Sequence, residues 1–106
     1  MARRKEQVAW SDPGLLILGS LASGPRHGYA ILQDVEATAG ISMGPGTLYG
    51  ALSRLEERGL VRPLPGDDRR RPYELTVDGA RVLRTRLESM KSFATRGLAR
   101  LGPVTP

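Results

Sequence analysis

The sequence has no cysteine and a single histidine, His27. Without cysteine the chain cannot form disulfides, bind a metal through thiolates or use a thiol as a nucleophile. One histidine cannot hold a metal ion alone, and no carboxylates cluster near it in the sequence. We therefore expect no metal, no cofactor and no catalytic residue. An enzyme is the least favoured class, because no nucleophile–base pair is visible.

Long apolar runs are also missing. No segment approaches the roughly 20 apolar residues that a helix needs to span a bilayer. The first residues are basic, but Glu6 and Gln7 follow them where a secretory signal would be apolar. These features predict a cytoplasmic protein without a membrane partner.

Positive charge, in contrast, is in excess. The 106 residues include 16 lysines and arginines against 11 acidic residues, which gives a formal net charge of +5. A basic surface favours a polyanionic partner, because binding to phosphates releases counterions. Arginine-rich composition can also reflect genome bias, so charge alone leaves nucleic-acid binding and an unspecialised basic protein both open. The length suits one domain with a helical extension.

Three short helices are predicted in the first half of the chain from capping residues and apolar spacing. Asp12 is the expected N-cap of the first helix, and Gly44 that of the third. On the third helix the apolar residues recur at spacings of four and three, which predicts an inner stripe of Leu48, Leu52 and Leu55. The expected helices begin near residues 13, 27 and 45, and they end near residues 22, 39 and 58.

The period then changes to that of β-strands. Residues 60–64 and 73–76 alternate, and a turn-rich loop with a basic tip separates them, which predicts a β-hairpin. Thr76 is the expected N-cap of a last helix over residues 77–101. The small and apolar residues of that helix alternate spacings of three and four, like a heptad seam.

This order of elements defines the predicted fold class. It is mostly α with a small β-hairpin, a winged helix-turn-helix over residues 13–76 followed by a C-terminal dimerisation helix over 77–101. A flexible basic arm is expected over residues 1–12, and a disordered tail over 102–106. The dimer contacts are predicted on the last helix, at Leu83, Leu87, Met90, Phe93, Ala94 and Leu98.

The outer face of the third helix is the candidate DNA-reading surface. Helical angles place Gly46, Gly50 and Ser53 opposite the leucine stripe, with Thr47, Tyr49 and Arg54 on the flanks. The hydroxyls can donate to phosphates, and the arginine can bind phosphate or guanine. A glycine inside a helix lowers helix stability by about 1 kcal/mol relative to alanine. Two glycines on one face therefore indicate that the helix backbone approaches another molecule closely. An ordinary solvated face is the alternative.

Three arginines form the predicted tip of the hairpin. A charge run in a loop is often only solvated, but a hairpin directly after a DNA-reading helix can lie along the backbone or in the minor groove. Asp67 and Asp68 partly cancel the local field, which favours contact by individual side chains. We expect phosphate contacts from Arg69, Arg70 and Arg71.

The start of the second helix holds three residues with two interpretations each. Tyr29 can touch a backbone phosphate or belong to the core. His27 can sense a ligand or contact DNA, although ordering the preceding turn is favoured. Gly28 is expected to let the first and second helices approach each other.

Over about residues 13–90 the chain resembles the PadR family of bacterial transcriptional regulators, because its short motifs occur in the order and spacing of that family. The resemblance implies a winged helix-turn-helix, a homodimer and repression from a palindromic operator. For many members it also implies release of DNA when a small, often aromatic, molecule binds. The motifs are Arg26-His27-Gly28-Tyr29, Pro45-Gly46-Thr47-Leu48-Tyr49, Leu52, Arg54-Leu55-Glu56, Gly59-Leu60-Val61 and Tyr73-Glu74-Leu75-Thr76.

Two departures from the family pattern stand out. Gly44 occupies a position where the family often has serine, so a side-chain cap is lost. Short members that bind planar drugs use a tryptophan on the last helix, whereas this helix has Phe93 and the only tryptophan is Trp10 in the arm. Trp10 and Phe93 are therefore the candidate effector contacts. For Trp10, packing against the last helix of either subunit is the favoured interpretation.

The sequence thus predicts a regulator that binds double-stranded DNA as a dimer, with the third helix in the major groove and the hairpin beside it. Such a protein is associated with the nucleoid when bound. The alternative from another class is a basic helical module that binds an acidic partner protein without reading DNA. The two glycines on the third helix, with its threonine and tyrosine, count against that alternative.

Overall fold

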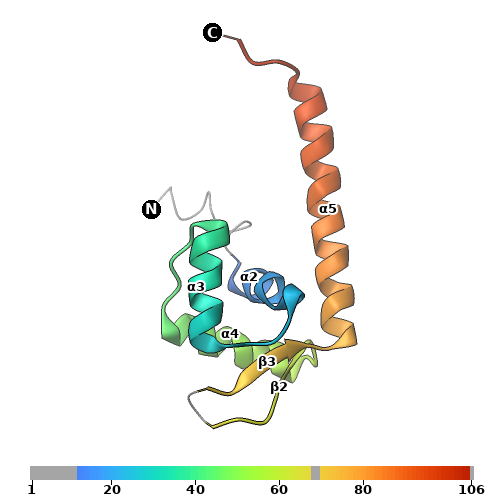
Figure 1. The fold of residues 1–106 in the computed structure, drawn as a ribbon. Helices are drawn as coiled ribbons and strands as arrows, with labels where there is room; N and C mark the ends of the chain where they lie inside the picture. Colours follow the sequence, from blue (N-terminus) through green and yellow to red (C-terminus); the bar gives the residue numbers. More distant parts are fainter. Residues whose placement is uncertain (1–11, 68–69, 106) are drawn as a thin grey trace.

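The structure is a computed structural model that describes residues 12–67 and 70–105. Helices dominate it, and a small sheet lies beside the helix over residues 45–57 (Figure 1). This arrangement is the predicted winged helix-turn-helix. In chain order the elements are α2 (Pro13–Ser20), the 3₁₀ turn η1 (Leu21–Ser23), β1 (Arg26–His27), α3 (Gly28–Ala39), α4 (Pro45–Glu57), β2 (Val61–Pro63), β3 (Pro72–Leu75) and α5 (Val77–Leu101).

A single apolar core joins α2, α3 and α4. Helix α2 is apolar on most of its surface and lies at the centre, with Ile17 fully buried. Ile31 from α3 and Leu48 from α4 are also fully buried against it. Burial of each such side chain contributes roughly 1.5–3 kcal/mol, so the core fixes the angle at which α4 crosses the other helices.

Three caps define helix ends, and two of them, Asp12 and Thr76, were predicted from the sequence. The carboxylate of Asp12 accepts a hydrogen bond from the Gly14 N–H at 3.0 Å and begins α2. Gly40 adopts a φ of 70° and ends α3 in the left-handed conformation. The hydroxyl of Thr76 accepts from the Gly79 N–H at 3.0 Å and donates to the Gly59 carbonyl at 2.6 Å. Thr76 therefore caps α5 and ties it to the end of the α4 segment.

The sheet has a third strand that the sequence analysis did not predict. β1 pairs antiparallel with β3, with Arg26 opposite Tyr73, and the strand order is β1-β3-β2. A strand of two residues is too short to show an alternating pattern, so no sequence signal marks it. The wing is thus fastened to the segment that leads into α3.

Helix α5 spans the predicted range, and in the described chain only its part up to Met90 packs on the core. Leu83 is buried in the core of its own chain, with 5% exposure, whereas the sequence analysis assigned it to a dimer seam. The second half of the helix extends beyond the other elements (Figure 1). In the described part of the chain, no helix is both long and apolar enough to cross a membrane.

Candidate nucleic-acid interface

The outer face of α4 is open within the described part of the chain. Gly46, Ser53 and Glu57 are exposed, and Gly50 is half-buried. A Cβ atom added at Gly46 would meet no atom within 4 Å. The opposite face is closed, because Leu48, Leu52 and Leu55 are at most 6% exposed. Helix α4 therefore has one face in the core and one bare, glycine-containing face, which is the division that a helix in a DNA groove needs.

One flank of α4 carries Tyr49, which lies against the start of α3. A Cβ atom at Gly28 would overlap the Tyr49 hydroxyl and would lie 3.2 Å from a methyl group of Leu48. The missing side chain at Gly28 thus makes room for α4. This corrects the expectation that Gly28 allows α2 and α3 to approach. Tyr49 remains 46% exposed, so its ring is held on one side and open on the other.

Tyr73 from β3 belongs to the same flank, and the sequence analysis had not singled it out as a site residue. Burial raises the pKa of its hydroxyl, and the carboxylate of Glu56 and the neighbouring Tyr49 raise it further, while Arg71 acts in the opposite direction. The phenol therefore stays protonated at neutral pH and keeps its ability to donate a hydrogen bond. A tyrosine opposite Arg26 in a three-strand sheet could not be placed from sequence alone, because β1 was not predicted.

The residues at the start of α3 face outward or cap the helix. Tyr29 is 65% exposed, which rules out the interpretation as a core residue. His27 is the N-cap of α3, and its Nδ1 accepts from the Ala30 N–H at 3.4 Å. This contact agrees with a role for His27 in ordering the turn.

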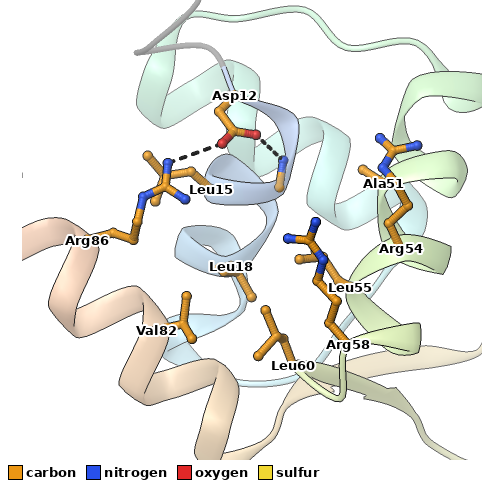
Figure 2. Close-up of a pocket in the computed structure, with 11 residues that line it drawn as sticks. Asp12, Leu15, Leu18, Ala51, Arg54, Leu55, Arg58, Leu60, Val82 and Arg86 are labelled. Atoms are coloured by element: carbon orange, nitrogen blue, oxygen red, sulfur yellow. Dashed lines mark hydrogen bonds and ion pairs between the residues drawn. The ribbon is translucent and has the colours of Figure 1, made fainter.

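The other flank of α4 carries Arg54 beside a pocket that the sequence analysis missed. The pocket lies between α2, α4 and α5 and is also lined by Arg58, Arg86 and Asp12 (Figure 2). Arg86 forms an ion pair with Asp12 at 3.2 Å. A terminal nitrogen of Arg54 lies near Gly50, so this guanidinium is at the edge between the pocket and the open face. Arg86 is far beyond Arg58 in the chain, and no spacing rule connects them.

The wing is held by cross-strand contacts. Arg62 of β2 and Glu74 of β3 form an ion pair at 2.6 Å. In the turn, the Arg70 N–H donates to the Asp67 carboxylate at 2.9 Å. Arg70 and Arg71 are exposed, and Arg69 lies outside the described residues.

The candidate dimer residues of α5 divide into two groups. Leu83 is buried and Met90 packs partly against the core. The others are open to solvent, and their exposed fractions are large: Leu87 47%, Phe93 80% and Leu98 71%, with Ala94 also exposed. Trp10, the other candidate effector contact, lies outside the described residues.

Comparison with protein families gives a match over most of the domain. The model described as the transcriptional regulator PadR-like family matches residues 17–85. This range includes α3, α4, the wing and the first third of α5.

Comparison with individual proteins agrees with that match. An uncharacterised 37.1 kDa protein in transposon TN4556 of Streptomyces fradiae is 46% identical to this chain over 86 residues. The matched segment is 81% of this chain and 25% of that protein, so the chain spans a quarter of this relative. A PadR family transcription regulator from Clostridium difficile R20291 has a TM-score of 0.75 at 25% identity, covering 85% of this chain and 98% of the other. RosR of H. salinarum has a TM-score of 0.70 at 32% identity, covering 77% and 74% of the two chains.

Proposed function

The chain belongs to the PadR-like family of transcriptional regulators, whose members bind DNA, and from this premise we propose that it is a repressor that binds a palindromic operator as a homodimer. The observation that carries the proposal is the bare outer face of α4, opposite a fully buried leucine stripe. A small dimer that occupies a promoter blocks access to it, which favours repression over activation.

In this proposal α4 lies in the major groove and the wing lies beside it. Gly46 and Gly50 allow the helix backbone to approach the base edges, while Ser53 and Arg54 supply donors. The remaining contacts go to phosphates, from the exposed tyrosine at the start of α3, the flank of α4 and the wing tip. These phosphate contacts are assigned to Tyr29, Thr47, Tyr49, Arg69, Arg70 and Arg71.

The homodimer is supported by the apolar surface that one subunit leaves uncovered. The exposed side chains Leu87 and Leu98 follow one side of α5. At its base this side continues into a groove lined by Leu16, Val35 and Met90. A second copy of the chain can cover both surfaces. Two α4 helices related by a two-fold axis would then meet half-sites about one helical turn apart, roughly 34–36 Å.

The proposal includes a small aromatic effector. Phe93 is 80% exposed on α5, on the part of the helix that a partner subunit would approach. An aromatic ligand stacked on Phe93, with Trp10 as a second contact, would change how two subunits meet and so change the distance between their α4 helices. Release of DNA would follow from that change.

A gel-shift competition tests the proposal. The protein is bound to DNA from the promoter next to its own gene, and unlabelled promoter DNA is compared with random DNA as competitor. We expect promoter DNA to compete at least about 1,000-fold better, the lower end of the usual range for specific binding. Equal competition by the two DNAs would favour the basic protein-interaction module instead.

A further inference from the structure

The pocket between α2, α4 and α5 has a closed apolar base and a charged rim. Its volume is about 290 Å³. Three of the leucines that line it, Leu15, Leu18 and Leu55, are at most 6% exposed, while Leu60 and Val82 are half-buried. What remains accessible is mainly the guanidinium groups of Arg54, Arg58 and Arg86 and the carboxylate of Asp12 (Figure 2).

The charges around this pocket are not balanced. Three guanidinium groups face one carboxylate. Both oxygens of that carboxylate are already used, one by the Gly14 N–H at 3.0 Å and the other by Arg86 at 3.2 Å. Among the described residues, no hydrogen bond or ion pair engages the side chain of Arg58 or Arg54. Like charges held near one another repel, and an anion placed between them removes that repulsion.

We propose that this pocket binds a phosphate group, held by Arg58 and Arg86 with Arg54 at its edge. The planar guanidinium fork matches the oxygens of a phosphate, and a charge-assisted pair of this kind is stronger than a neutral hydrogen bond. Arg58 points into the space between α2 and α4, and Arg86 reaches from α5 to Asp12 at the start of α2, at another part of the pocket wall (Figure 2). Two of the three arginines therefore meet the ligand from different helices.

The phosphate can come from two sources. A helix in the major groove lies between two phosphate backbones. The flank of α4 with Tyr49 would face one backbone, and the flank with Arg54 and Arg58 would face the other. On this account, which rests on the proposed function, the pocket takes a phosphate of the DNA strand. A free phosphate or a phosphorylated small molecule offers the same chemistry without DNA.

Asp12 sets the strength of the site, because it competes with the phosphate for Arg86. Asn is as good an N-cap as Asp, so Asp12→Asn keeps the cap of α2 and removes the competing charge. This variant gives a gain of binding, which loss of folding cannot imitate.

The first experiment uses no DNA. Inorganic phosphate is titrated into the protein at constant ionic strength, and arginine side-chain signals are followed by NMR. We expect saturable binding that Arg58→Gln weakens about tenfold, the equivalent of one charge-assisted hydrogen bond. Asp12→Asn should tighten binding. Arg84→Gln should leave it unchanged, because Arg84 is an exposed arginine of α5 that pairs with Glu88 at 3.9 Å and does not line the pocket.

The second experiment identifies the source. The DNA affinity of Arg58→Gln and Arg84→Gln is measured across a range of salt concentrations. If the phosphate belongs to DNA, Arg58→Gln lowers the salt slope by about one, whereas a free phosphate ligand leaves the slope at the Arg84→Gln value. The proposal is wrong if Arg58→Gln and Arg84→Gln agree in both experiments. Because the phosphate titration contains no DNA, it still decides the question if the chain fails to bind an operator.

Discussion

At the residue scale, glycines on the helices have opposite roles that depend on what surrounds them. Gly28 faces the Tyr49 hydroxyl and Leu48, so the fold leaves no room for a side chain there. A Cβ atom added at Gly50 would make only an ordinary contact, at 3.7 Å from a nitrogen of Arg54. A Cβ atom added at Gly19 would meet no atom within 4 Å, so Gly19 serves as a control for Gly28.

Replacing Gly28 by alanine tests the packing of Tyr49. The new Cβ would displace the tyrosine ring and press on Leu48, so we expect Gly28→Ala to lower the free energy of unfolding by about 1–2 kcal/mol. Gly19→Ala should raise it, by up to about 1 kcal/mol, through helix propensity alone. Urea denaturation of the two variants gives both values. Equal stability of the two variants would contradict the close contact at Gly28.

Replacing Gly50 by alanine separates stability from function. Alanine is the better helix former, and the site has room for it, so the variant should be more stable by roughly 0.5–1 kcal/mol. The added methyl group stands on the open face of α4, and we expect operator affinity to fall although stability rises. Denaturation and a binding titration check the two effects. Unchanged affinity would show that the backbone at this position does not approach DNA.

At the scale of elements, α5 has two halves with different environments. Its first turns are fixed to the domain through Thr76 and Leu83, while Leu98 and its neighbours have no cover within the described chain. The first half therefore contributes to the stability of one subunit. The second half gains little stability from packing within the described part of the chain.

The cap of α5 can be tested with two substitutions. Thr76→Ala removes both the acceptor for the Gly79 N–H and the donor to the Gly59 carbonyl. We expect a loss of about 1–2 kcal/mol in the free energy of unfolding. Thr76→Ser keeps the hydroxyl and should lose much less. Thermal unfolding distinguishes the variants, and similar losses for alanine and serine would argue against the cap.

The open side of α5 is tested with neighbouring residues that point in different directions. Leu98→Asp places a charge among the exposed apolar side chains, and Ala99→Asp places one about 100° further around the helix, away from Leu87 and Leu98. We expect the first to weaken the dimer strongly and the second to leave it intact, with both subunits folded. Sedimentation over a range of concentrations measures the change. A dimer unaffected by Leu98→Asp would place the interface elsewhere.

At the scale of the whole molecule, the surplus of positive charge has a defined place only after folding. Arg54 and Arg58 line the pocket beside one flank of α4, and Arg71 of the wing acts on the hydroxyl of Tyr73, which belongs to the other flank. A net charge of +5 spread evenly would give weak, nonspecific attraction to DNA. Arranged on both sides of one helix, the same charges can position that helix in the groove.

Replacing Arg69, Arg70 and Arg71 together by glutamine should lower affinity for operator and random DNA alike. Each lost phosphate contact lowers the salt slope by about 0.9, so the slope should fall by up to about three. Affinity measured across salt concentrations for both DNAs provides the test. A wild-type slope in this variant would mean that the wing tip does not contact phosphates.

The helices, their caps and the inner stripe of α4 could be predicted from the sequence, since these depend on residues a few positions apart. Asp12 and Thr76 could be assigned as caps from local spacing alone, and so could the inward direction of the α4 leucines. The range of α5 followed in the same way, from a cap and a regular spacing.

Tertiary structure alone decided the contacts between residues distant in the chain. It paired Arg26 with Tyr73, placed Tyr49 on Gly28, buried Leu83 and brought Arg58 and Arg86 to one pocket. None of these contacts has a sequence period, because each depends on the angle at which two elements pack. That angle is set by the core as a whole.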